Sequence, residues 1–149
     1  MKLAEALQER ADLNRQIEHL RSRLSHNAIV QEGEAPAEDP GDLLAQLDRA
    51  TARLEELMAS INLANSRTVV NDKTLTQIIA RKDCLRLRLE AYRELAETAS
   101  QTARRATRSE IRILSTVDVK TIQAQVDTMA KELRLLDNEL QQTNWTTEL

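Results

Sequence analysis

Every glycine and every proline of this 149-residue chain lies between residues 33 and 41, inside the stretch EGEAPAEDPG at residues 32–41. Helix interiors exclude proline and disfavour glycine, so long segments that lack both residues favour helices. The four helix-breaking residues are Gly33, Pro36, Pro40 and Gly41. Their position predicts that one helix stops here and that the chain reverses into the next.

Apolar residues recur at steps of three and four residues in four separate segments, which places each set on one helix face. The four sets are Leu3, Ala6, Leu13, Ile17, Leu20 and Leu24; Leu43, Leu47, Ala50, Leu54, Leu57, Ile61 and Ala64; Ile78, Leu85, Leu89, Tyr92, Ala96, Ala99 and Ala103; and Val119, Ile122, Val126, Met129, Leu133, Leu136 and Leu140. Polar residues, Arg10 and Lys82, interrupt the first and third sets. The pattern predicts an all-α fold, with helices at about residues 2–27, 42–65, 74–104 and 118–143.

The connections between these segments are short or moderate, which favours antiparallel neighbours. We therefore expect a single domain over residues 1–149, an up-down-up-down four-helix bundle. Asp39-Pro40, Thr74 and Asp118 stand where helices two, three and four begin, and each supplies a competent N-cap. The β-branched stretches 27–32 and 110–117 fall at one end of such a bundle, where they could pair as a small β-ribbon.

The third segment carries a second apolar stripe, roughly opposite its core stripe. Its members are Ala80, Cys84, Leu87, Ala91 and Leu95. A helix that is apolar on two sides must bury both, and a lone four-helix bundle would leave one side in water. The stripe predicts a homo-oligomer in which this surface is the interface between subunits.

Opposite charges gather in two connections that a bundle would bring to the same end. The acidic residues are Glu32, Glu34, Glu38 and Asp39, and the basic residues are Arg104, Arg105, Arg108 and Arg112. We expect ion pairs between these two loops, within or between subunits. The acidic loop lacks the ligand spacing of a calcium loop, and metal binding there is the weaker alternative. The arginine run lacks interleaved aromatic residues, and the net charge of −3 argues against nucleic acid as the partner.

The carboxyl ends of the second and fourth segments should meet at the other end of the bundle. They carry Asn62, Asn65, Asn144 and Trp145. Asparagine readily terminates helices, and tryptophan covers apolar surface while its N–H finds a partner. We expect these four residues to form a structural cap, with a ligand pocket as the alternative.

Catalytic chemistry has little support in the sequence. His19 and His26 belong to no Glu-x-x-His pair of the kind that holds metals inside helical bundles, and Cys84 has no histidine near it in the sequence. With only two glycines, no nucleotide-binding loop or nucleophile elbow can form. We expect a non-enzymatic protein without a cofactor. The single thiol and the amino-terminal stretch MKLAEALQER, which resembles no secretory signal, favour the cytoplasm.

Five stretches carry a resemblance to a known family: MKLAEALQER, VQEGEAPAEDP, TLTQIIARKD, SEIRILSTVDV and LDNELQQTNWTTEL. Together they resemble small bacterial proteins labelled septicolysin, over essentially the whole chain. The resemblance implies a helical fold and a bacterial or phage source, and it supplies no catalytic residues. The leading expectation is a structural or interaction protein that self-associates. A membrane-active toxin, as the label implies, and a metal- or ligand-binding bundle are the alternatives.

Overall fold

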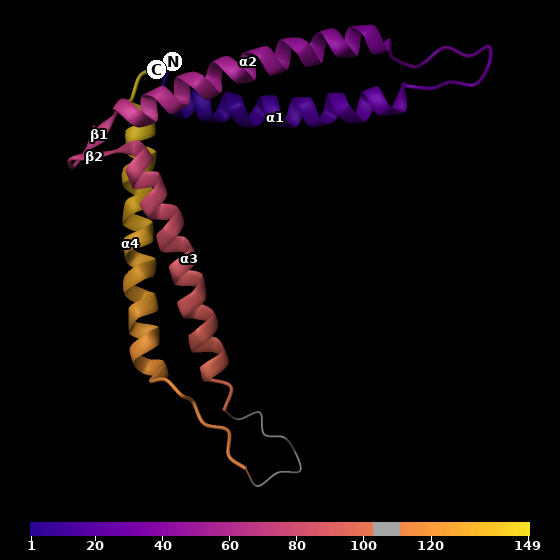
Figure 1. Ribbon diagram of the computed structural model, residues 1–149. Coiled ribbons are helices and arrows are strands. Elements are labelled where there is room, and N and C mark those ends of the chain that lie inside the picture. The colour runs from indigo at the N-terminus through magenta and orange to yellow at the C-terminus, as the bar shows by residue number, and fades with distance from the viewer. Residues whose placement is uncertain (103–110) are drawn as a thin grey trace. The chain divides into compact units, whose positions relative to one another are not determined.

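The computed structural model describes residues 1–102 and 111–149. Figure 1 shows four long helices, α1 (Leu3–His26), α2 (Pro40–Arg67), α3 (Leu75–Ala99) and α4 (Val119–Thr146), with two short strands, β1 (Val69–Val70) and β2 (Lys73–Thr74). The predicted all-α fold of four long helices is therefore confirmed. The helix ends lie within about three residues of their expected positions, except that α3 stops at Ala99 rather than near residue 104.

The chain divides into two compact units. Unit 1 comprises Met1–Val69 and Thr143–Leu149, and unit 2 comprises Val70–Gln142. Within each unit two successive helices run antiparallel, α1 with α2 and α3 with α4 (Figure 1). The expectation that residues 1–149 pack as one bundle domain stays a prediction.

Unit 1 is built on the seam between α1 and α2. Its buried apolar side chains are Leu3, Ala4, Ala6, Leu20, Leu43, Ala50, Leu57 and Ile61. An ion pair ties the two helices together beside this seam: Arg53 donates to both carboxylate oxygens of Glu9, at 2.7 and 3.0 Å. Two helices alone cover each other only on one side, so Leu13, Ile17 and Leu47 remain half-buried along the same seam.

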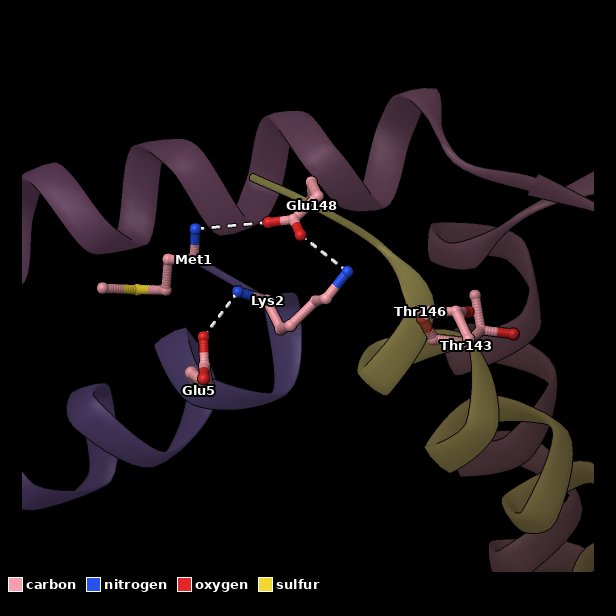
Figure 2. Close-up of polar contacts among 6 residues, drawn as sticks. All are labelled: Met1, Lys2, Glu5, Thr143, Thr146 and Glu148. Atoms are coloured by element: carbon pink, nitrogen blue, oxygen red, sulfur yellow. Dashed lines mark hydrogen bonds and ion pairs between the residues drawn. The ribbon is translucent and has the colours of Figure 1, made fainter.

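The carboxyl-terminal residues also belong to unit 1. The backbone N–H of Leu3 donates to the carbonyl of Thr147 at 2.9 Å, and the N–H of Leu149 donates to the carbonyl of Met1 at 3.0 Å. Figure 2 shows Glu148 between the amino group of Met1 and the ammonium of Lys2, at 3.2 and 2.6 Å. The last turn of α4 and the start of α1 are thereby joined.

The connection from α1 to α2 explains why the glycines and prolines gather there. Asp39 caps α2, accepting a hydrogen bond from Gly41 N–H at 3.1 Å, and Pro40 occupies the first helical position. Gly33 has φ of +83°, in the left-handed region that glycine enters without a steric penalty. Gly33 and Pro40 therefore each suit the backbone conformation at their position in this reversal.

The small ribbon lies elsewhere than the sequence predicted. Residues 27–32 and 111–117 form no strand, and residue 110 lies outside the described residues. The ribbon instead joins β1 to β2 through Asn71 and Asp72, whose φ angles are +50° and +63°. Positive φ at both central residues is what a tight two-residue hairpin requires, and asparagine and aspartate tolerate it. The predicted pairing between 27–32 and 110–117 is wrong, because a local turn supplies the ribbon without any long-range partner.

Unit 2 is the hairpin of α3 and α4. Its core cluster consists of Leu85, Leu89, Val126 and Met129, with Tyr92, Ala130 and Leu133 packed against it. The caps are those that the sequence predicts. Thr74 accepts from the N–H of Gln77 at 3.2 Å, and Asp118 accepts from the N–H of Lys120 at 3.1 Å.

Lys82, the polar residue within the core stripe of α3, forms an ion pair with Asp137 on α4. A long lysine side chain can lie along apolar surface while its ammonium reaches a carboxylate at the edge, so a polar residue fits this position.

Candidate interaction surface

The side of α3 that faces away from α4 exposes apolar residues. Leu87 is 66% exposed and Leu95 is 42% exposed, and the neighbouring small residues are exposed too. We call this surface the α3 outer face and define it as Ala80, Cys84, Leu87, Ala91 and Leu95. The structure brings all five predicted residues to one side of the helix, away from α4, because the core stripe occupies the other side.

Charged residues flank the α3 outer face asymmetrically. One flank, which we call the basic flank, holds Arg81 and Arg88. The other, the acidic flank, holds Asp83, Glu90 and Glu94, placed there by the helical repeat. Because one edge is basic and the other acidic, a second helix meets different charges when it lies parallel to α3 than when it lies antiparallel.

The basic flank leans toward α4. Arg81 forms an ion pair with Glu132, and the guanidinium carbon of Arg88 lies 5.3 Å from the centre of the Tyr92 ring. Such a stacked arginine keeps its N–H groups at the rim of the ring, where they can still donate. Within residues 1–102 and 111–149, Arg88 and Asp83 form no ion pair.

Two shallow grooves run beside this flank along α4. They have volumes of about 360 and 370 Å³ and share Thr128 and Glu132 as lining residues. Both are open and lined mostly by surface residues, apart from the buried Leu136 and Met129, and their described lining lacks the convergent buried polar groups of a small-molecule site. The grooves extend the surface that a protein partner on α3 could contact.

Only some of the residues that were predicted to pair, between the acidic loop and the arginine run, are among the described residues. Arg104, Arg105 and Arg108 lie outside them, and Arg112 is exposed. Glu38 forms an ion pair with Arg23 on α1, and this contact lowers the pKa of Glu38 below its ordinary value. Glu32 and Glu34 are exposed. Pairing of the acidic loop with the arginine run stays a prediction.

The four residues of the predicted cap all belong to unit 1. Asn65 and Asn144 are half-buried, Asn62 is exposed, and Trp145 is 51% exposed. The role of these residues as a cap stays a prediction.

Metal ligands do not gather in the described part of the chain. Across residues 1–102 and 111–149, no group of three or more His, Cys, Asp or Glu side chains could hold a metal ion. The Nδ1 atom of His26 lies 2.7 Å from the carbonyl oxygen of Ser22 on its own helix. His19 is exposed on α1, seven residues before His26.

Sequence reasoning missed the contacts around Glu148. The hydrogen bond from Lys2 is the main cause that lowers the pKa of the Glu148 carboxyl, followed by the amino group of Met1. Residues at the two ends of a chain carry no spacing signal for each other, so no local pattern could have indicated this contact. It closes unit 1 by joining α1 to the segment that follows α4.

A helix that crosses a bilayer needs about 20 predominantly apolar residues in succession. None of the helices within residues 1–102 and 111–149 is both long and apolar enough to cross a membrane. The helices instead carry many polar and charged residues at their exposed positions.

Comparison with known proteins gives a family and a structural relative. The family model of DUF6847, a family of unknown function, matches residues 10–149. A crystal structure of a functionally unknown conserved protein from Corynebacterium diphtheriae is 38% identical, with a TM-score of 0.94, over 100% of this chain and 98% of that one. Among curated proteins none matches.

These findings overturn the resemblance to septicolysin, which neither match supports. The quoted stretches are compatible with a helical fold, but they carry no evidence of lytic activity. The match across residues 10–149 covers nearly the whole chain, and the chain belongs to the DUF6847 family.

Proposed function

We propose that this protein is a non-enzymatic structural or interaction protein that self-associates through the α3 outer face. The observation that carries the proposal is the exposure of two leucines, Leu87 and Leu95, within one continuous apolar stripe. Single exposed leucines are ordinary on protein surfaces, whereas a stripe that repeats over about four helical turns is typical of a helix–helix interface.

The energetics favour covering this stripe. Moving a leucine side chain from water to a packed interface contributes about 1.5–3 kcal/mol. The small residues Ala80, Cys84 and Ala91 alternate with the leucines and let a second helix approach closely, at roughly the 8–10 Å separation of packed helices. Within unit 2, α4 covers the opposite side of α3 and leaves this stripe exposed.

The exposed thiol of Cys84 bears on the compartment. A single accessible cysteine suits a reducing environment, in which it stays a thiol. We therefore place the protein in the cytoplasm as part of the same proposal.

The test replaces one leucine at the centre of the surface. Leu87→Glu should separate the subunits while leaving the helical circular dichroism intact, because burying an unpaired carboxylate costs more than dissociation. The matched control is Leu44→Glu, an exposed leucine on α2 that lies outside the proposed surface. Light scattering should give a reduced mass for the first variant and an unchanged mass for the second.

Two results would overturn the proposal. The first is an unmodified chain with a monomer mass of about 16.9 kDa at all concentrations. The second is an oligomer whose mass Leu87→Glu and Leu44→Glu leave equally unchanged, because the interface would then lie elsewhere.

A further inference from the structure

We propose that the α3 helices of two copies pair in parallel and in register, so that the basic flank of each copy faces the acidic flank of the other. This inference rests on the proposed self-association and adds to it the identity, direction and register of the partner helix. The occupant of the α3 outer face is then the same face of a second copy.

Helical geometry permits this pairing within unit 2. The core stripe of α3 packs against α4, and the outer face lies on the far side of the same helix. A second α3 can therefore lie against the outer face without displacing α4. The two α3 helices then lie at the centre, each with the α4 helix of its own copy on its far side. Leu87 and Leu95 of each copy are covered by the other copy.

Charge decides the direction of the pair. When two identical helices pair in parallel, opposite flanks meet, and when they pair antiparallel, like flanks meet. In the parallel register Asp83 faces Arg88 of the second copy, and symmetry repeats that pair. Neither residue has an ion-pair partner among the described residues, so both are available.

The antiparallel alternative brings like charges together. A pair centred on the stripe would place Asp83 near Glu90 of the second copy and Arg88 near Arg81 of the second copy. Like charges at facing flank positions oppose association. The asymmetric flanks therefore favour the parallel pair.

Register places identical residues opposite each other. Ala80, Cys84, Leu87 and Ala91 fall at the alternating three- and four-residue positions that face a partner helix. In the parallel pair Cys84 meets Cys84 of the second copy across the seam, with Ala80 and Ala91 in layers on either side. A disulfide needs Cβ atoms about 3.5–4.5 Å apart, so only residues that directly face each other across the seam can form one.

The native chain thus carries its own probe, since Cys84 is its single cysteine. Diamide takes two electrons and two protons from a pair of thiols, forming one disulfide while it is itself reduced to the hydrazine. We expect the folded, unmodified protein to give a cross-linked dimer on a non-reducing gel. Cys84→Ser/Ala91→Cys should cross-link equally well, because residue 91 also faces its own counterpart.

A control separates specific pairing from chance collision. Cys84→Ser/Gln123→Cys moves the thiol to an exposed position on α4, away from the proposed seam. This variant should give no dimer above the background of an unfolded sample treated in the same way. If it cross-links as fully as the unmodified chain, the disulfide of Cys84 reports collision, and the pairing is wrong.

Cross-linking of a mixture of two variants determines whether the two α3 helices pair in parallel or antiparallel. An equimolar mixture of Cys84→Ser/Ala80→Cys and Cys84→Ser/Ala91→Cys is oxidised, and its disulfide-linked peptides are identified by mass spectrometry. The parallel pair should give 80–80 and 91–91 links, because identical positions face each other. The antiparallel pair brings position 80 opposite position 91, so abundant 80–91 links would overturn the inference.

A charge variant tests the flanks independently. Asp83→Arg brings a second guanidinium against Arg88 in the parallel pair and should weaken association at least several-fold. In the antiparallel pair the same change would face Glu90 and strengthen association. Asp83→Arg/Arg88→Asp should restore the affinity. If Asp83→Arg tightens the assembly, or if the double variant fails to recover it, the parallel pairing is wrong.

These outcomes also distinguish the two proposals. A monomeric unmodified chain removes self-association altogether, and the pairing with it. An oligomer that Leu87→Glu dissociates, but in which Cys84 does not cross-link, keeps the proposed function and removes only the direction and register.

Discussion

Asn27 is the buried polar side chain of the described residues, with 8% of its surface exposed. Its amide N–H₂ donates to the carbonyl of Arg23 at 2.8 Å, and its carbonyl oxygen accepts from the N–H of Glu38 at 3.0 Å. It therefore ties the end of α1 to the residues just before α2. The connection between the two helices is held at both of its ends by this one side chain.

Asn27→Leu keeps the branching at Cγ and removes both hydrogen bonds. We expect the free energy of unfolding of unit 1 to fall by about 1–3 kcal/mol, because the N–H of Glu38 loses its partner. Urea unfolding followed by the fluorescence of Trp145, which belongs to the same unit, measures the change. The control Asn62→Leu, on the exposed side of α2, should stay within about 0.5 kcal/mol. Equal effects of the two variants would contradict this role for Asn27.

The Glu9–Arg53 contact predicts a pH dependence. The hydrogen bond from Arg53 is the main cause that holds the pKa of Glu9 below its ordinary value of 4.5. Because the folded pKa lies below the unfolded one, the stabilisation is present above pH 4.5 and is lost as the pH falls through the folded value. The melting temperature of the unmodified protein should therefore fall more between about pH 6 and pH 3 than that of Glu9→Gln. The variant has no carboxylate at position 9 and so lacks the one group whose protonation differs between the folded and unfolded states here. Parallel curves would contradict it.

Single residues differ in how well the sequence revealed them. Asp39, Thr74 and Asp118 were predicted as caps because a cap acts on the two or three residues that follow it. Asn27 was not predicted to be buried, because its burial depends on how the loop folds back. The pair of Glu9 with Arg53 joins residues 44 positions apart, and no local pattern connects them.

At the scale of elements, the hairpin between β1 and β2 holds its shape through two residues with positive φ. Asp72→Gly should raise stability by up to about 1 kcal/mol, because glycine adopts φ near +63° without the steric penalty of a side chain. Asp72→Val should lower it by about 1–2 kcal/mol, since a β-branched residue resists that region. Thermal melts by circular dichroism compare the two. The opposite order would show that this turn does not constrain the hairpin.

The core of α3 and α4 predicts a larger effect. Leu89 is 2% exposed within the central cluster, so Leu89→Ala should destabilise unit 2 by about 2–5 kcal/mol. Native-state hydrogen exchange of the intact protein, measured in the peptides that cover α3 and α4, gives the stability of this unit. Leu135→Ala, at an exposed position on α4, is the matched control and should change it by about 0.5 kcal/mol or less. If both variants exchange alike, the register of the helices is wrong.

The helices were predictable because their apolar period is strong and their breakers are concentrated in one loop. The ribbon was misplaced because the sequence Val-Val-Asn-Asp-Lys-Thr is too short to show an alternating pattern. In contrast, the two-sided character of α3 was evident from spacing alone, and the exposure of Leu87 and Leu95 agrees with it. This exposure shows that the α3 outer face is uncovered in the single chain.

At the scale of the whole molecule, the division into two compact units limits how much core each can build. A pair of helices buries one seam and leaves its outer sides in water. The proposed association with a second copy would let unit 2 bury more apolar surface, at the α3 outer face. The sequence predicted this surface, whereas it held no sign that the carboxyl-terminal residues join unit 1.

Salt should affect the assembly in a defined way. Ion pairs at exposed flanks are screened as ionic strength rises, with a Debye length of about 10 Å at 0.1 M and 3 Å at 1 M. The apolar contacts of Leu87 are not weakened by salt in the same way. We therefore expect a modest loss of affinity at high salt in the unmodified chain and a much smaller loss in Asp83→Asn/Arg88→Gln. Equal losses would show that these flanks do not meet.

The mass of the unmodified chain in solution tests the central claim most directly. Light scattering at increasing protein concentration should show a multiple of 16.9 kDa that falls toward 16.9 kDa only on dilution. A concentration-dependent mass of this kind is what burial of the α3 outer face against a second copy predicts. A mass of 16.9 kDa at every concentration would contradict the account, because Leu87 and Leu95 would then stay in water without a function in assembly.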